Sequence, residues 1–382
     1  GGLPKSIVAA QPEEHTEILA VFPVPGHEVL GPLVVIAWLV VHTIGRGGTV
    51  DLDGQRLFST ASSREAAKVP IWAAVALYAM LLLLTLPVLG VLVSHPEMYH
   101  ASPEVREETF GILLKEYLPT GMLGIALAAL LASVMSTVDS HLNYGAQTLV
   151  NDVFRQVFPD SKLLDSSTRS AVWIGRLTML GILALGIVVM YMSESLFGIV
   201  TVIAGMFASV ALFYWAQWWW WRVNFASWLA AMIGGPAVYF GLGAVLPNWS
   251  WWQEQLMVSS AHQDSMAMLQ AIIAIVVNTL IWWSVTLMFP PESEKTLVDF
   301  YRRARPPGVW GPIREKVQAL GEPISKQILL WPGTLTAIVG AVSISLPVVA
   351  ISQLVVGRYL YAVALVGEGL VGGALFLPMF RR

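Results

Sequence analysis

Residues 117–154, YLPTGMLGIALAALLASVMSTVDSHLNYGAQTLVNDVF, decide the fold class of this chain. The first half is apolar enough to enter a bilayer. The second half keeps a helical period while adding a polar stripe of Ser133, Ser136, Thr137 and Ser140, with Asp139 and Asn143 at its edge. Ionisable and polar groups are costly inside a membrane. The stripe therefore predicts an ion or substrate path along this helix.

Composition assigns the whole chain to the membrane. It is 56% hydrophobic and 12% charged, with a mean hydropathy of +0.66, whereas soluble domains carry about 25% charged residues. We therefore expect an all-α, polytopic membrane bundle in contact with the lipid bilayer. A net charge of -3 offers no basic excess for nucleic acid. The absence of cysteine excludes a disulfide scaffold, a thiolate zinc site and cysteine catalysis.

Nine apolar segments are candidates for membrane spans, and most of them reach the roughly 20 residues that cross a bilayer. They are residues 31–44, 70–93, 117–150, 171–192, 196–221, 226–247, 267–289, 328–351 and 358–380. The first is short and runs into the glycine-rich stretch IGRGGTVDLDGQR. Two interpretations stay open there: a helix interrupted at membrane depth, as in secondary transporters, or a short helix that ends in a turn at Gly45.

Basic residues predict the orientation of the spans. With nine spans, 18 of the 22 lysines and arginines fall in loops on one side, which the positive-inside rule makes cytoplasmic, together with the C-terminus. The tryptophan run WAQWWWWRVN at 215–224 then meets the cytoplasmic headgroups, where tryptophan is favoured. The cytoplasmic loop 290–327 is too short for an independent domain, so we expect it to pack against the bundle or lie at its surface.

The motifs of ATP-driven transport, zinc hydrolysis and serine hydrolysis are missing, since the chain has no Walker-type loop, no HExxH and no GxSxG. An enzyme is therefore not expected. Most histidines lie in loops, and the two at membrane depth, His42 and His141, are interpreted as packed or hydrogen-bonded side chains.

Three stretches resemble the sodium/solute symporter family of bacterial proline, sugar and sialic-acid symporters and animal sodium–glucose cotransporters. The polar helix ending in ALLASVMSTVDSHLN, followed by DVF, is similar to the eighth core helix of that family. The stretch GQRLFSTASSREAAK resembles the segment after its sixth helix, and FYRRARPPGVWGPI resembles a loop of its bacterial members. The resemblance covers nearly the whole chain.

The resemblance implies a leucine-transporter-type inverted repeat of five plus five helices. Residues 1–30 would be an extramembrane loop, with core helices six to ten of the second repeat in 31–224. Two extra spans would occupy 225–289, and two C-terminal spans 328–382, on either side of the cytoplasmic loop 290–327. The chain begins at Gly1 without a signal-like or initiator segment, so we expect it to be a C-terminal part that lacks the first repeat.

By resemblance, sodium would be bound by the hydroxyls of Ser136 and Thr137 and the carbonyl of Ser133. Asp139 and Ser140 match positions that some family members use for an additional sodium ion. Neutral hydroxyl and carbonyl oxygens suit a hard cation that must be released again. The alternative is that these hydroxyls bond back to carbonyls four residues earlier or let helices approach closely. Asp139 is an ion ligand, a proton-linked carboxyl or a structural acceptor.

The resemblance also places the solute near the sixth core helix, at Trp38, His42, Thr43 and Gly45, although Trp38 and His42 are equally explained as packing residues. The predicted function is sodium-coupled symport that imports a small organic solute, such as a sugar, amino acid or carboxylate, across a bacterial plasma membrane. The alternatives are a transporter-fold sensor or scaffold without net transport, and a proton-coupled carrier. The sequence leaves the oligomeric state open.

Overall fold

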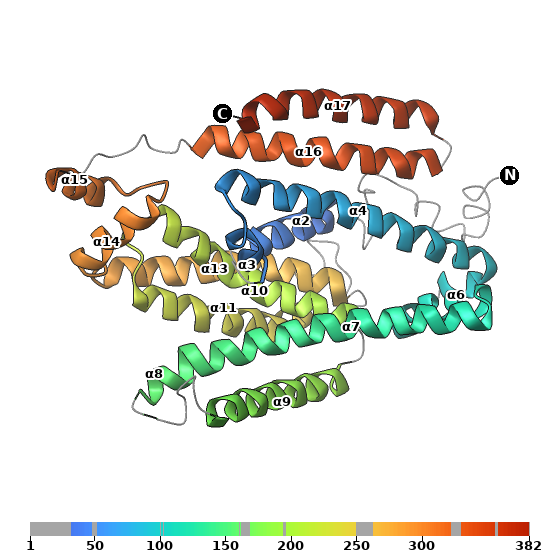
Figure 1. Cartoon of the computed structure of the whole chain (residues 1–382), viewed down its shortest axis with the longest axis horizontal. Coiled ribbons are helices and arrows are strands. Elements are labelled where there is room, and N and C mark those ends of the chain that lie inside the picture. Colours follow the sequence, from blue (N-terminus) through green and yellow to red (C-terminus); the bar gives the residue numbers. More distant parts are fainter. Residues whose placement is uncertain are drawn as a thin grey trace. The chain divides into compact units, whose positions relative to one another are not determined.

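A computed structural model describes residues 32–47, 52–99, 101, 103–159, 161, 169–193, 196–249, 263–321, 330–355 and 358–381. Within these residues the regular structure is helical, apart from one isolated bridge between Trp220 and Val309 (Figure 1). The elements are α2 (Pro32–Gly47), α3 (Leu52–Phe58), α4 (Ser63–Ser94), η2 (Pro96–Tyr99), α5 (Pro103–Glu107), α6 (Thr109–Tyr117), α7 (Thr120–Thr148), η3 (Leu149–Phe154), α8 (Arg155–Val157), α9 (Arg169–Tyr191), α10 (Leu196–Trp219), α11 (Phe225–Val245), η5 (Leu246–Asn248), α13 (Gln263–Met288), α14 (Glu294–Ala304), α15 (Gly311–Ala319), α16 (Leu330–Val355) and α17 (Tyr359–Arg381).

Six stretches of the described residues are helices long and apolar enough to cross a membrane. They are Thr120–Val157, Arg169–Tyr191, Gly198–Trp219, Phe225–Asn248, Ala267–Met288 and Tyr359–Met379. The other expected spans fall on α2, α4 and α16. Helices satisfy every backbone polar group internally, which lipid requires of a spanning segment. The predicted fold class, a polytopic helical membrane bundle, is confirmed.

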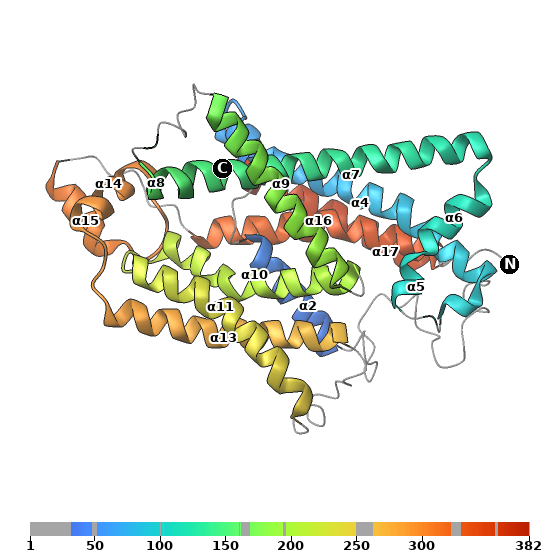
Figure 2. The same ribbon diagram turned by 90° about the horizontal axis from the view of Figure 1, so that it is seen from below.

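The chain divides into two compact units, residues 1–82 with 197–382 and residues 83–196. In the first unit, α11 lies along α13, and α2 packs against α13 (Figure 2). A cluster of buried side chains joins α2, α10, α11 and α13, and it includes Ala37, Val41, Ala208, Tyr239, Met268 and Ile275. The first turn of α11 is set locally, because Asn224 and Ser227 form a capping box with reciprocal hydrogen bonds.

The short helices α14 and α15 pack on each other and on the tryptophan-rich end of α10. Trp310 donates its indole N–H to the carbonyl of Trp218 at 2.9 Å, and the backbone N–H of Val309 bonds to the carbonyl of Trp219 at 2.6 Å. Gly308, with φ at +100°, permits this approach. The expectation that this loop packs against the bundle is therefore confirmed for its described residues.

Helices α16 and α17 run side by side as a closely packed pair (Figure 1). Glycines face the partner helix at three points, where an added Cβ atom would lie within 3 Å of Phe376, Pro347 or Ser343. Such close backbone approach is typical of helix pairs in membranes. A hydrogen bond of 3.2 Å between the hydroxyls of Tyr78 and Ser345 also ties α16 to α4.

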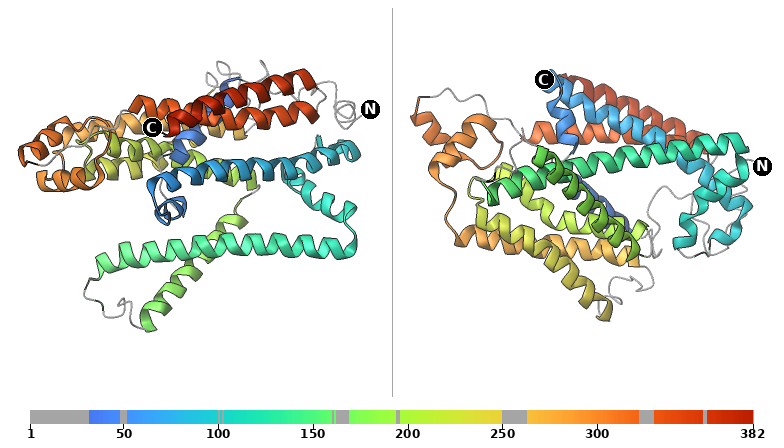
Figure 3. Two further views of the ribbon diagram at one scale, coloured as in Figure 1. Left: turned by 45° about the horizontal axis from the view of Figure 1, so that its top comes forward. Right: turned by 60° about the horizontal axis from the view of Figure 1, so that its bottom comes forward.

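The second unit is built around α7, which continues through the π-helical turn η3 into α8 (Figure 3). Helix α9 packs against α7 and η3. The contact with α7 is close at Gly145, where a Cβ atom would lie 3.1 Å from the side chain of Ile182. The polar stripe lies on α7, before this contact region.

Helix α2 contains no interruption between Pro32 and Gly47. The prediction of a helix broken near Gly45 is wrong for these residues, and the helix also runs two residues past the turn expected at Gly45. A glycine inside a helix costs only about 1 kcal/mol relative to alanine. The burial of Ala37 and Val41 against the α10–α11–α13 cluster accounts for a helix that tolerates its glycines.

Candidate functional site

The polar stripe begins halfway along α7. The helix starts directly after Pro119, and its first turns carry only small and apolar side chains apart from Thr120. From Ser133 to Asn143 the stripe residues are exposed within the unit, so α9 does not cover them. The structure therefore places Ser133, Ser136, Thr137, Asp139 and Ser140 together on one helix, with their oxygens accessible.

Two hydroxyl groups of the stripe bond to the backbone of their own helix. Thr137 donates its hydroxyl hydrogen to the carbonyl of Ser133 at 3.0 Å, and Ser140 donates to the carbonyl of Ser136 at 3.0 Å. This is the local bonding expected as the alternative to ion binding. These two bonds direct the hydroxyl hydrogens of Thr137 and Ser140 toward the backbone. Because a hydroxyl is both donor and acceptor, its oxygen keeps lone pairs that can bind a cation. The Ser133 carbonyl, in contrast, is already an acceptor.

Asp139 is the carboxylate at the edge of the stripe. It accepts a hydrogen bond of 3.1 Å from the side-chain amide of Asn143, one turn later. The ring nitrogen Nδ1 of His141 lies 2.8 Å from the carbonyl of Thr137, in agreement with the interpretation of His141 as hydrogen-bonded. One carboxylate beside several neutral oxygens is a donor set for a hard cation bound weakly.

Among the described residues, no three or more histidine, aspartate or glutamate side chains form a group that could hold a metal ion. The nitrogen and carboxylate clusters typical of zinc or other transition metals are therefore not found in this part of the chain. The stripe on α7 and the carboxylate at its edge carry hydroxyl, carbonyl and carboxylate oxygens, which are the ligand types that a hard cation prefers.

The residues expected to contact the solute lie on α2, in the other unit. Trp38 and His42 stack with ring centroids 4.4 Å apart and ring planes inclined by 21°. Trp38 packs against the α10–α11–α13 cluster, as its interpretation as a packing residue predicts, whereas Thr43 is exposed. The backbone of Gly45 is helical. On α2 the structure thus brings Trp38 and His42 together.

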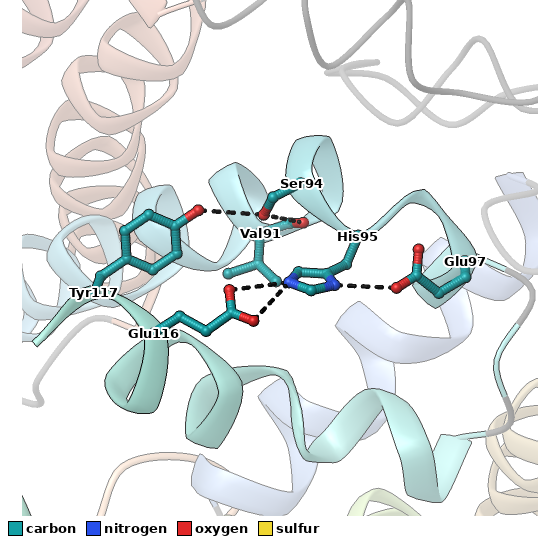
Figure 4. Close-up of polar contacts among 6 residues, drawn as sticks. All are labelled: Val91, Ser94, His95, Glu97, Glu116 and Tyr117. Atoms are coloured by element: carbon teal, nitrogen blue, oxygen red, sulfur yellow. Dashed lines mark hydrogen bonds and ion pairs between the residues drawn. The ribbon is translucent and has the colours of Figure 1, made fainter.

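A histidine cluster at the end of α4 received no role in the sequence analysis. His95 lies with Nδ1 3.0 Å from Glu97 and Nε2 3.0 Å from a carboxylate oxygen of Glu116 on α6 (Figure 4). Hydrogen bonds with Glu116, and next with Glu97, raise the pKa of His95 above its ordinary value. The pKa of Glu97 is lowered, first by its own backbone N–H and then by His95. The sequence signal for this cluster was weak, because the two carboxylates are 2 and 21 residues away from the histidine in the chain.

The same corner is closed by a second contact between α4 and α6. Tyr117 donates a hydrogen bond of 3.3 Å to the hydroxyl of Ser94, which donates to the carbonyl of Val91 (Figure 4). An apolar hollow of about 370 Å³ lies beside it, lined by Pro87, Gly90, Val91, Leu113, Leu114, Tyr117 and Leu118. Its lining lacks the convergent polar groups of a small-molecule site. We interpret this corner as a clasp that holds α6 on α4.

Comparison with known proteins decides the family. The model of the sodium:solute symporter family matches residues 24–235, more than half of the chain. The chain belongs to the sodium:solute symporter family. The match runs from before α2 into α11 and includes the polar stripe of α7. No curated protein and no solved structure gives a significant match.

Membership confirms the resemblance drawn from the α7 segment and from GQRLFSTASSREAAK, which lie within the matched residues, whereas FYRRARPPGVWGPI lies outside the match. Proteins of this family are transporters rather than enzymes, and their name states the coupling of sodium to a solute. The apolar helices of the chain agree with an integral membrane protein. Sodium, a small solute and the lipid bilayer are accordingly the partners that the family indicates.

Proposed function

We propose that this protein uses the sodium gradient to import a small organic solute, such as a sugar, an amino acid or a carboxylate, by alternating access. Family membership is the observation that carries the proposal. Each sodium ion moving inward supplies about 2.3 kcal/mol per 100 mV of membrane potential, in addition to its concentration gradient. In this proposal α2, α4, α7, α9 and α10 are core helices six to ten of a five-plus-five inverted repeat.

The sodium site of the proposal includes the hydroxyl oxygens of Ser136 and Thr137 on α7. Support comes from the orientation of Thr137, whose hydroxyl hydrogen bonds to the carbonyl of Ser133 and whose oxygen keeps its lone pairs. Asp139 and Ser140 are also exposed on α7, and in the proposal they supply a carboxylate and a further hydroxyl for an additional ion. Sodium bound here favours the outward-open arrangement, because a ligand shifts a conformational equilibrium only by its differential affinity.

The solute in this proposal binds next to α2, near Trp38, His42, Thr43 and Gly45. The stacking of Trp38 on His42, which brings two of these four residues together on α2, supports this placement. The proposed orientation places the C-terminus in the cytoplasm of a bacterial cell, because the loops on that side hold most of the lysine and arginine residues.

Sodium binding can be measured without knowing the solute. We expect the double variant Ser136→Ala/Thr137→Ala of the full-length protein to bind ²²Na⁺ at least about tenfold more weakly, which corresponds to about 1.4 kcal/mol. The matched control is Thr178→Ala on α9, since Thr178 donates to the carbonyl of Ile174 in the same way but lies off the stripe. Equal affinity of the double variant and the control would remove Ser136 and Thr137 from the site.

Transport itself is tested by uptake into proteoliposomes from a panel of labelled sugars, amino acids and carboxylates, with and without an inward sodium gradient. Sodium-dependent accumulation of one class supports the proposal. Accumulation that follows a proton gradient in the absence of sodium, and is lost in Asp139→Asn, would replace it with a proton-coupled carrier. Specific solute binding without accumulation under either gradient would favour a sensor.

A further inference from the structure

The ring of His95 lies between two carboxylates that come from different elements. Its Nδ1 atom is 3.0 Å from Glu97 in η2, and its Nε2 atom is 3.0 Å and 3.1 Å from the two carboxylate oxygens of Glu116 in α6 (Figure 4). His95 itself directly follows the last residue of α4. The contact with Glu97 is local, whereas the contact with Glu116 joins the end of α4 to α6 across 21 residues.

Both contacts require a hydrogen atom on the ring nitrogen. An ionised carboxylate is only an acceptor, and a neutral imidazole has one N–H group and one lone pair. In either neutral tautomer, one of the two carboxylates would therefore face a lone pair at 3.0 Å, which is repulsive. The imidazolium form donates from both nitrogens and satisfies Glu97 and Glu116 together.

The charges around His95 favour the same protonated form. The hydrogen bond with Glu116, followed by that with Glu97, raises the pKa of His95 above its ordinary value of 6.5, and among the described residues these are the charged groups that act on it. Tyr117, the other titratable side chain at this corner, donates its hydroxyl hydrogen to Ser94 at 3.3 Å (Figure 4). One proton on His95 therefore decides whether both carboxylates are held at once.

Helix α6 also forms one wall of the apolar hollow beside this corner. The lining comes from both helices: α4 supplies Pro87, Gly90 and Val91, and α6 with the residue that follows it supplies Leu113, Leu114, Tyr117 and Leu118. Two polar contacts hold this wall in place, that of His95 with Glu116 and that of Tyr117 with Ser94. A distance of 3.3 Å is long for a bond between hydroxyl groups, and charge-assisted bonds are stronger than neutral ones. The contact between His95 and Glu116 is therefore the stronger link.

We propose that this corner is a pH-sensitive latch, in which protonated His95 holds α6 against the end of α4, and loss of the proton releases α6 and opens the apolar hollow. After deprotonation, the one remaining N–H group can serve only one carboxylate. Glu97 stays within reach because it is two residues away in the chain, whereas Glu116 is carried by a separate helix. Because the pKa of His95 is raised in the folded chain, the latch is held below about pH 6.5 and released as the pH rises through the raised pKa.

Distances between spin labels in the full chain measure the release directly, because the protein has no cysteine of its own. The reporter pair is Leu83→Cys on α4 and Gly111→Cys on α6. Leu83 is exposed, and a Cβ atom at Gly111 meets no atom within 4 Å. From about pH 6 to about pH 9 we expect a second, longer distance to appear, with the ratio of the two populations changing by up to about tenfold per pH unit, since one proton is released. A single unchanged distance over this range would overturn the proposal.

Variants at the latch separate the charge of His95 from its packing. His95→Arg keeps several N–H donors and a permanent charge, so it should retain the short distance at every pH. His95→Gln carries no charge and should give the longer distance at every pH. Glu97→Gln removes one of the two groups that raise the pKa of His95, so release should begin at a lower pH. A pH response that persists in His95→Gln, or release of α6 at high pH in His95→Arg, would refute control by the His95 proton.

A second pair of labels tests whether pH changes the unit more widely. Leu131→Cys on α7 and Leu180→Cys on α9 replace two exposed leucines on helices that pack together. The readout is a distance between helices, so it is independent of sodium and solute binding. The distance of this control pair should stay constant over the same pH range, and a parallel change at both pairs would replace the latch with a general loss of structure.

Discussion

The Asn278→Ala substitution tests what holds α10, α11 and α13 together. Asn278 on α13 is fully buried, and its side-chain amide donates to the carbonyl of Ser209 on α10 at 2.8 Å and to the carbonyl of Ala231 on α11 at 3.1 Å. Gly235 makes this approach possible, since a Cβ atom there would lie 2.8 Å from the hydroxyl of Ser209. One side chain therefore bridges three helices.

The size of the effect follows from these two hydrogen bonds. In membrane bundles a hydrogen bond between helices contributes about 0.6 kcal/mol on average and at most about 1.7 kcal/mol. Both carbonyls keep their helical N–H partners, and the Oδ1 atom of Asn278 is buried without a partner, so its removal leaves no new unpaired group. We expect Asn278→Ala to lower the free energy of unfolding by about 1–3 kcal/mol, or the apparent melting temperature by roughly 2–6 °C.

The measurement is the apparent melting temperature of the purified protein in detergent, followed by tryptophan fluorescence and by loss of the monodisperse peak. Asn248→Ala is the matched control. Asn248 also donates its amide to a backbone carbonyl, that of Ala244 at 3.2 Å, but it is exposed at the end of η5, the turn after α11. A shift for Asn278→Ala no larger than that of the control would refute a bridging role.

Two further predictions concern the loops. Gly308→Ala should destabilise the contact of α14 and α15 with α10 by about 1–3 kcal/mol, since a Cβ atom would lie 2.5 Å from the carbonyl oxygen of Trp219 at a positive φ. Limited proteolysis measures this effect, and we expect the 290–321 loop to be cleaved faster in Gly308→Ala than in Gly311→Ala. Gly311→Ala is the control because a Cβ atom at Gly311 meets no atom within 4 Å. Equal cleavage rates would contradict the prediction. Glu116 raises the pKa of His95 above 6.5, so the stabilisation by His95 should be complete below about pH 6.5 and lost as the pH rises through the raised pKa. The hydrogen-exchange rates of α6 in the wild type and in His95→Gln should therefore become equal at high pH. A difference between the two rates that grows with pH would show that the stabilisation has the opposite pH dependence.

The helices were predictable because lipid leaves few alternatives. A run of about 20 apolar residues must satisfy its backbone within itself, so each of the nine apolar segments falls on a helix. Local signals also place some helix ends, as the Asn224 and Ser227 capping box does for α11. Length, apolarity and capping are properties of neighbouring residues, and for that reason a single sequence carries them.

Contacts between distant residues were not predictable in the same way. Trp310 meets Trp218 across 92 residues, and the belt interpretation of the tryptophan run does not foresee that its carbonyls accept bonds from a loop. The choice left open for α2, between an interrupted helix and a turn at Gly45, could not be made from the sequence either, and α2 is helical from Pro32 to Gly47. The clasp around His95 likewise depends on Glu116, which is 21 residues away.

Only the part of the candidate sodium site that lies on one helix, α7, was predictable from the sequence. A period of 3.6 residues puts Ser133, Thr137 and Ser140 on one face, and the structure confirms that they share it and that Thr137 and Ser140 bond back to carbonyls four residues earlier. In the proposed sodium site the remaining ligands would come from another segment, and the pattern of one helix says nothing about them. The π-helical turn that follows α7 was likewise invisible in the sequence pattern.

Asp139 shows how neighbouring residues favour a cation as the partner of a carboxylate in the proposed site. Asn143, one turn later, donates its side-chain amide to Asp139, and the hydroxyl-bearing residues Ser136 and Thr137 are also exposed on α7. In the proposed function a cation at this point of α7 would therefore meet several oxygens of one helix, and its remaining ligands would have to come from another segment.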